Sequence, residues 1–185
     1  MDKTQVAVFV GSLRKDSFNR KLARAVEKLA PASFTFEHVQ LDDLPHYNQD
    51  FDAAYPAEAT RLKDQVAAAD ALLFVTPEYN RSIPGVLKNA LDLGSRPWGK
   101  NSFAGKPAAV LGMSVGAIGT ALAQQHLRNV LAYLDAPTLG QPEIFLQHKD
   151  GLFGEDGGIA VESTKKLLQG FVDKYAAWIE THRAR

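Results

Sequence analysis

The sequence has no cysteine, no net charge and no long apolar run, and each absence excludes a class of protein. Without cysteine there are no disulfides, no thiolate catalysis and no zinc–thiolate site. Lys plus Arg and Asp plus Glu both number 21, which gives no electrostatic basis for binding nucleic acid or an anionic membrane. No apolar run reaches the roughly 20 residues of a membrane helix, and residues 1–5 lack signal-peptide features. We therefore expect a cytoplasmic protein with small-molecule partners.

Motifs for several other chemistries are missing as well. No G-x-G-x-x-G follows the first apolar run, so the Rossmann dinucleotide fingerprint is absent. Gly99 and Gly105 are one residue too far apart for a Walker A loop, and Pro107 follows Lys106 where that loop needs Ser or Thr. The five histidines show no metal-ligand spacing, and no serine lies in a G-x-S-x-G elbow. We predict neither a metal site nor a hydrolytic serine.

Strand and helix patterns alternate along the whole chain, and no linker divides it, so residues 1–185 are predicted to form a single domain. Strands are expected at residues 6–10, 34–41, 71–75 and 107–113, and a fifth around Leu139 and residues 144–146, interrupted by Pro142. Helices are expected at residues 22–29, 59–69, 84–93 (with Pro84 in the first turn) and 120–134, and along a C-terminal apolar stripe of Leu167, Leu168, Phe171, Val172, Tyr175, Trp178 and Ile179. Residues 42–56 are expected to form a loop, as are the glycine-rich residues 151–158.

This alternation predicts an α/β fold, a flavodoxin-like doubly wound sheet of five parallel strands in the order 2-1-3-4-5 with helices on both faces. In such sheets ligands bind beyond the carboxyl ends of the strands, near the point where the strand order reverses. The loops after the first, third and fourth strands are therefore the candidate site.

The first of these loops, residues 11–19, joins a strand to a helix N-terminus and has the composition of a phosphate site. Free backbone N–H groups and the positive end of the helix dipole favour an anion there. Ser12, Ser17 and Asn19 add short neutral donors, and Arg14 adds a forked cationic one. Ser17 is also suited to cap the helix.

The other two loops supply surfaces for a flat ring. Residues 76–85 place Tyr79, Asn80 and Ser82 between two prolines that restrict the backbone, which suits the edge of a polar heterocycle. Residues 114–119 bring small residues and free N–H groups close together. A phosphate pocket, a planar shelf and a backbone-lined wall together match the needs of flavin mononucleotide (FMN).

These residues resemble the NAD(P)H-dependent FMN reductases, a family that includes bacterial quinone and chromate reductases and related azoreductases. The resemblance spans nearly the whole chain. Its sharpest elements are G-S-x-R-x-x-S-x-N at residues 11–19 and P-E-Y-N-x-S-x-P-G at residues 77–85; further similarities are L-K-N-A-L-D at residues 87–92 and A-G-K-P at residues 104–107.

The resemblance implies a site and a reaction. Ser12, Arg14, Ser17 and Asn19 hold the FMN phosphate, and Leu13 and Phe18 shape the same loop. Pro77, Glu78, Tyr79 and Asn80 border the ribityl chain and the isoalloxazine, with Arg81 beside them at a position that is often aromatic in the chromate-reducing members, and Ser114 and Gly116 close the other side. The implied reaction passes a hydride from NADPH or NADH through FMN to a quinone or another small electrophile, such as an azo- or nitro-aromatic compound or chromate, without a catalytic side chain. A homodimer or homotetramer is also implied.

Two alternatives stay open on the sequence alone. A flavodoxin-like electron carrier or redox-regulated binding module holds FMN but does not itself oxidise NAD(P)H; such carriers use an acidic face to dock partners, and the neutral charge balance disfavours this. A fold that has lost FMN is the third possibility. Trp98 and Phe103 are candidates either for the roof of a substrate pocket or for an oligomer interface.

Overall fold

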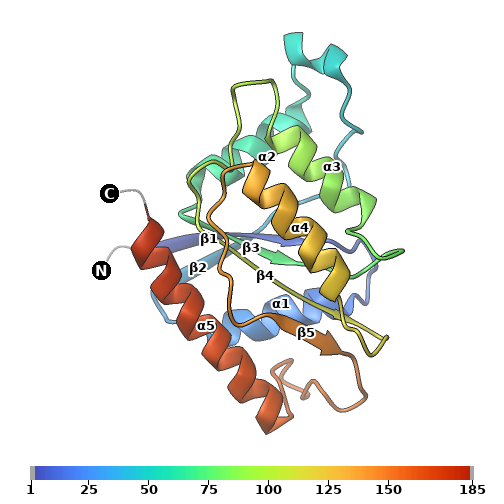
Figure 1. Ribbon diagram of the computed structural model, residues 1–185, viewed down its shortest axis with the longest axis vertical. Coiled ribbons are helices and arrows are strands. Elements are labelled where there is room, and N and C mark those ends of the chain that lie inside the picture. Colours follow the sequence, from blue (N-terminus) through green and yellow to red (C-terminus); the bar gives the residue numbers. More distant parts are fainter. Residues whose placement is uncertain (1–2, 184–185) are drawn as a thin grey trace.

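A computed structural model describes residues 3–183 and shows a central parallel sheet between two layers of helices (Figure 1). The strands lie in the order β2-β1-β3-β4-β5, and every neighbouring pair is parallel. The predicted flavodoxin-like sheet is thereby confirmed. Its elements are β1 (Thr4–Val10), α1 (Phe18–Leu29), β2 (Phe34–His38), the 3-10 helix η1 (Gln49–Ala53), α2 (Ala57–Ala68), β3 (Ala71–Val75), α3 (Gly85–Gly94), β4 (Ala108–Ser114), α4 (Ala121–Tyr133), β5 (Ile144–Gln147) and α5 (Glu162–His182).

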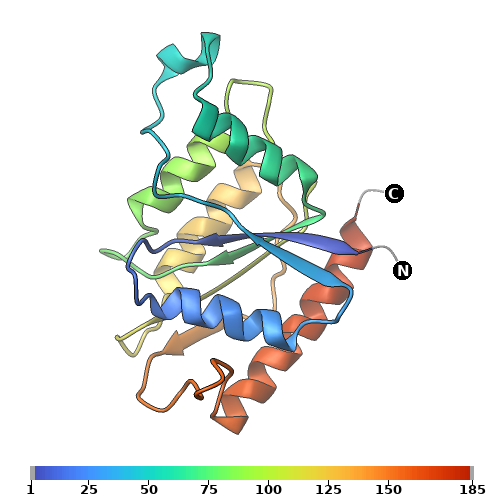
Figure 2. The same ribbon diagram turned by 180° about the vertical axis from the view of Figure 1, so that it is seen from behind.

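Each face of the sheet is covered by its own set of helices. Helices α1 and α5 pack on one face, and α2, α3 and α4 pack on the other, as Figures 1 and 2 show from opposite sides. Side chains of a strand alternate between faces, so Val8 packs toward α1 and α5 while Phe9 packs toward the other three helices. The middle strand β3 is buried along its whole length, which explains its continuous apolar sequence.

Several predicted boundaries need correction. The first strand already begins at Thr4 and the first helix at Phe18, and the predicted loop at residues 42–56 contains the 3-10 helix η1. The second strand ends at His38 instead of residue 41, because Val39 and Leu41 leave the strand and pack into the core beside α2 and α3. Pro84 is the N-cap of α3 and does not lie in its first turn; its backbone is extended, with ψ of 146°.

The fifth strand is shorter than predicted. Leu139 lies outside it and makes a separate contact with β4, in which its N–H donates to the carbonyl of Ala108 at 2.8 Å. The chain then leaves the sheet around Pro142 and rejoins it at Ile144. The interruption predicted at Pro142 is therefore confirmed, although Leu139 belongs to the connection and not to the strand.

Most of the predicted C-terminal stripe faces the core. Leu168, Phe171, Val172, Tyr175 and Ile179 are buried, and the Tyr175 hydroxyl donates to the carbonyl of Leu72 at 2.7 Å. Burial raises the pKa of Tyr175 well above its ordinary value. Leu167 is exposed, so its assignment to the stripe is wrong: it points away from the sheet.

Phe103 has neither of the two roles considered for it. It is fully buried beside Phe9, with ring centroids 6.1 Å apart, and belongs to the core between the sheet and α3. Trp98 is 78% exposed and stays a candidate for a surface contact. No helix within residues 3–183 has the length and apolarity to cross a membrane.

Candidate functional site

The loop after β1 has the structure of an anion site. Ser12 is buried behind exposed Leu13 and Arg14, and Ser17 caps α1 by accepting a hydrogen bond from the N–H of Arg20 at 3.3 Å. The first helical hydrogen bond runs from Lys21 N–H to the Ser17 carbonyl, so the amides that precede it have no helical acceptor. These amides, the hydroxyls of Ser12 and Ser17 and the guanidinium of Arg14 form a set of hydrogen-bond donors suited to a phosphate.

Asn19 joins this loop to the end of β4. Its side chain is buried, its Nδ2 donates to the carbonyl of Met113, and the N–H of Met113 donates to its Oδ1, both at 2.9 Å. The pair of bonds fixes the first turn of α1 against the end of β4. The side chain that was predicted to hold the phosphate is thus engaged with the backbone, which indicates that it positions the loop.

Arg14 is exposed but is not isolated. Its guanidinium lies 5.1 Å from the centroid of the Phe18 ring, within cation–π range. Phe18 also stacks on His148, with centroids 3.7 Å apart. The connection after β5 therefore supports the phosphate loop through His148. His148 is one of the five histidines without metal-ligand spacing, and no local pattern in the sequence links it to Phe18.

The loop after β3 contains a tight reverse turn. Tyr79 and Ser82 exchange both backbone hydrogen bonds at 3.0 Å, and Asn80 and Arg81 between them have φ of 52° and 66°. Two central residues with positive φ define a type I′ turn. Asn tolerates this conformation and Arg does not favour it. The turn leaves the Tyr79 ring half exposed next to buried Pro77.

Glu78 connects this turn to α4. Its Oε2 accepts hydrogen bonds from the backbone N–H groups of Leu122 (3.0 Å) and Ala123 (3.1 Å). A carboxylate suits the positive end of α4, whose own N-cap residue makes no side-chain cap. Arg81 lies 3.5 Å from the other Glu78 oxygen. The Glu78 side chain therefore caps α4 from the loop after β3.

We expect Glu78→Ala to lower the free energy of unfolding by about 1–2 kcal/mol, because two N–H groups of α4 lose their acceptor. Urea denaturation of the flavin-free protein measures this. Glu155→Ala in an exposed loop is the control and should change stability by no more than about 0.5 kcal/mol. Equal effects of the two variants would show that Glu78 contributes no cap.

The loop after β4 is a compact wall held by its own serine. The hydroxyl of Ser114 donates to the carbonyl of Gly116 at 3.2 Å and also bonds the carbonyl of Gly119. Gly119 has φ of 67° and lies so close to Phe145 that no side chain fits there. Gly116 is exposed on the surface of this wall.

The three loops meet at one edge of the sheet. In Figure 2 they gather on the left, where β1, β3 and β4 end. A Cβ on Gly11 would lie 3.1 Å from Thr76 Oγ1, so the first and second loops are in close contact. Asn19 joins the first loop to the end of β4, where the third loop begins. Glu78 joins the second loop to α4, which follows the third loop. Large apolar side chains are exposed around this edge, as is typical of a ligand groove: Leu13, Tyr79, Val115, Ile118 and Leu122.

The residues at this edge fit FMN. Buried and capping serines, free helix amides and Arg14 suit a phosphate, and the half-exposed Tyr79 and the small-residue wall suit a flat ring. A doubly wound sheet with such a site at its switch point defines a flavodoxin-like nucleotide-binding protein.

Comparison with known proteins narrows this class. Residues 4–151 match the family model of NADPH-dependent FMN reductases, and the chain belongs to this family. The sequence is 55% identical over 179 residues to a 2-hydroxy-1,4-benzoquinone reductase of a Burkholderia species, covering 97% of this chain and 98% of that protein. It is 50% identical over 180 residues to a quinone reductase of Pseudomonas putida, covering 97% and 96%.

A solved structure agrees with these relatives. FerB, a flavoenzyme NAD(P)H:acceptor oxidoreductase from Paracoccus denitrificans, is 49% identical and superposes with a TM-score of 0.95, covering 98% of this chain and 100% of that one. The prediction of an FMN-dependent NAD(P)H oxidoreductase of the quinone reductase type is thereby confirmed.

Proposed function

We propose that this chain holds FMN between its three loops and uses it to oxidise NAD(P)H and reduce a quinone. The overall reaction converts NAD(P)H, a proton and a quinone into NAD(P)⁺ and a hydroquinone. The observation that carries the proposal is the connection between the loops: Asn19 bonds Met113 at the end of β4, and Glu78 caps α4. These contacts hold a phosphate site and a ring site at a fixed separation.

Each loop has a distinct part in binding FMN. Ser12, Arg14, Ser17 and the first amides of α1 hold the phosphate, while Leu13 and Phe18 give the loop its shape and Asn19 positions it. Pro77, Glu78, Tyr79, Asn80 and Arg81 form the turn that borders the ring and the ribityl chain. Ser114 and Gly116 form the opposite wall, where Ser114 acts by holding the backbone.

The protein acts by binding and orientation. The chemistry that bound FMN supplies is two-electron transfer from NAD(P)H to the acceptor. Glu78 is the acidic residue of the loop after β3 (residues 76–85). Two backbone amides hold its carboxylate, so it positions the turn and does not transfer protons. Tyr79 and the exposed apolar side chains exclude water beside the ring.

The finer properties of the enzyme follow from this proposal. An open ring face discriminates little between small electrophiles, so azo- and nitro-aromatic compounds and the oxyanion chromate join quinones as candidate acceptors. We infer a homodimer or homotetramer of single-domain subunits, located in the cytoplasm, for which exposed Trp98 and Tyr133 are candidate contact residues.

An anaerobic titration of the purified protein tests the proposed function. We expect flavin absorption bands that bleach when NADPH is added and return when a quinone is added. Bands that bleach only with a partner reductase would identify an electron carrier. A colourless protein that does not take up added FMN would contradict both functions.

Replacing Arg14 by alanine tests the phosphate site. We expect FMN affinity to fall by about 1–3 kcal/mol, which is roughly 5- to 150-fold, because a charge-assisted hydrogen bond is lost. Fluorescence titration of the flavin-free protein with FMN gives the dissociation constant. Lys15→Ala removes a neighbouring exposed charge and is the matched control. If both variants bind FMN equally well, Arg14 does not contact the phosphate.

A further inference from the structure

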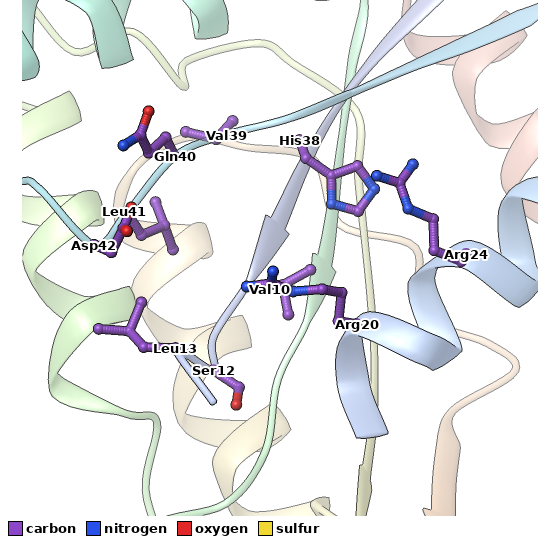
Figure 3. Close-up of a pocket in the computed structure, with 10 residues that line it drawn as sticks. All are labelled: Val10, Ser12, Leu13, Arg20, Arg24, His38, Val39, Gln40, Leu41 and Asp42. Carbon is purple, nitrogen blue, oxygen red and sulfur yellow. The ribbon is translucent and has the colours of Figure 1, made fainter. Parts of the chain in front are cut away.

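A cavity lies next to the proposed FMN site, on the β2 side of the loop at residues 11–19. It has a volume of about 320 Å³ and opens between the carboxyl ends of β1 and β2 (Figure 3). It shares Ser12 and Leu13 with the FMN site but otherwise uses different residues. Its lining comprises Val10, Ser12, Leu13, Arg20, Arg24, His38, Val39, Gln40, Leu41 and Asp42.

One wall of this cavity carries cationic side chains. Arg20 and Arg24 lie one turn apart on α1, and His38 ends β2. In Figure 3 Arg20 extends across the end of β1 beside Val10, and Arg24 extends toward His38. Within residues 3–183, no carboxylate lies within ion-pair distance of Arg20. Its guanidinium is thus available to an anionic ligand.

Glu27 orients Arg24 and His38 from behind. Its carboxylate bonds Arg24 Nη1 at 2.9 Å and also bonds His38 Nε2. Burial raises the pKa of Glu27, but the bonds from His38 and Arg24 outweigh it and hold this pKa below its ordinary value. The carboxylate stays ionised and fixes the directions of Arg24 and His38.

The remaining lining has different chemistry. Asp42 and Gln40 lie across the cavity from the arginines in Figure 3 and offer acceptors and a donor. Val10, Val39 and Leu41 are nearly buried and give the cavity an apolar floor. Phosphate ligands, hydroxyl-binding groups and an apolar surface thus lie together, and this combination is what a nucleoside diphosphate requires.

We propose that this cavity binds the adenosine diphosphate half of the NAD(P)H donor. Arg20 and Arg24 hold phosphate oxygens, Asp42 accepts hydrogen bonds from ribose hydroxyls, and the base lies on the apolar floor. The cavity borders the phosphate loop through Ser12 and Leu13, so a dinucleotide lying across that loop reaches both the cavity and the ring site. The proposal depends on the proposed NAD(P)H oxidation.

The double variant Arg20→Gln/Arg24→Gln tests this site. We expect the KM for NAD(P)H to rise about 10- to 100-fold, while the KM for the quinone and the FMN content stay unchanged. Binding of ADP to the FMN-loaded protein, measured by calorimetry, should weaken to the same degree. The control Lys21→Gln/Lys28→Gln removes two charges from α1 outside the cavity and should leave both quantities near the wild-type values.

Several outcomes would overturn the proposal without affecting the proposed function. The first is that the arginine variant keeps the wild-type KM for NAD(P)H and the wild-type affinity for ADP. The second is that the lysine control changes these two quantities as much as the arginine variant does. The third is that the arginine variant loses FMN. If the arginine variant fails to fold, Asp42→Asn tests the opposite wall, because Asp42 is exposed outside any helix or strand. Unaltered ADP binding by Asp42→Asn would then overturn the proposal. Failure of the wild-type protein to oxidise NAD(P)H would instead contradict the proposed function.

Discussion

Replacing Gly112 by alanine is expected to destabilise the protein by about 3 kcal/mol or more, at the upper end of the cost of overpacking a core. Gly112 lies in β4, where an added Cβ would be well inside 3.0 Å of both the Thr76 carbonyl oxygen and Thr120 Oγ1. Neither neighbour moves freely, because Thr76 follows β3 in the backbone and the Thr120 hydroxyl accepts a hydrogen bond from Gln124. The methyl group must therefore displace part of the site.

This substitution affects function as well as stability. Thr76 begins the loop after β3 and Thr120 is the N-cap of α4, so displacing either one separates surfaces that are proposed to hold the flavin. We expect Gly112→Ala to lose FMN during purification and to unfold at a lower urea concentration. Circular dichroism and the flavin absorption ratio measure the two effects.

Gly170 offers a matched control on α5. An alanine Cβ there meets no atom within 4 Å, and Gly170 is exposed. Because alanine favours helix more than glycine, Gly170→Ala should stabilise the protein by about 0.5–1 kcal/mol. If the two glycine substitutions changed stability in the same direction and by similar amounts, close packing at Gly112 would not be the cause.

Replacing Asn19 by leucine is expected to lower the free energy of unfolding by about 2–5 kcal/mol, because burying an unsatisfied polar group costs about 1–3 kcal/mol. Leucine has a similar size but leaves both the N–H and the carbonyl of Met113 without the partners that Asn19 provides. Urea denaturation of the flavin-free protein measures the loss. Asn129→Leu, at an exposed position on α4, should stay within about 0.5 kcal/mol of the wild type.

The same variant separates two roles for Asn19. A positioning role predicts that the flavin-free protein is destabilised and that FMN binding weakens as a consequence. A role limited to direct phosphate contact predicts weaker FMN binding with no change in the stability of the flavin-free protein. That second result would contradict the positioning role inferred from the Met113 hydrogen bonds.

Local patterns in the sequence were sufficient to predict the class of fold. The third strand is found at residues 71–75 as predicted, because a continuous apolar run of five residues between turn signals suits a strand covered on both faces. The helix boundaries were less certain, since the extended Pro84 precedes α3 and does not lie inside it. The loop that leads from β1 into the N-terminus of α1 was also predicted, because its serines and arginine lie close together in the sequence beside a helix start.

The functions of individual side chains depended on contacts between distant segments. The sequence predicts that Asn19 is a phosphate ligand, but its hydrogen-bond partner Met113 is 94 residues away. The sequence predicts that Glu78 borders the flavin, but its carboxylate caps a helix 44 residues further along. His38 lines the cavity beside Arg20 and Arg24 only because β2 pairs with β1 and places His38 beside α1.

The division between sequence and structure has a physical reason. Periodicity, capping residues and loop composition reflect forces that act within a few residues, so the sequence by itself determined the order of elements, the sheet class and the loop whose donors suit a phosphate. Side-chain partners across the fold are set by how the helices pack on the sheet. The tertiary structure alone therefore decided that Asn19 joins α1 to β4, that Glu78 caps α4, and that Arg20 and Arg24 share a cavity with His38.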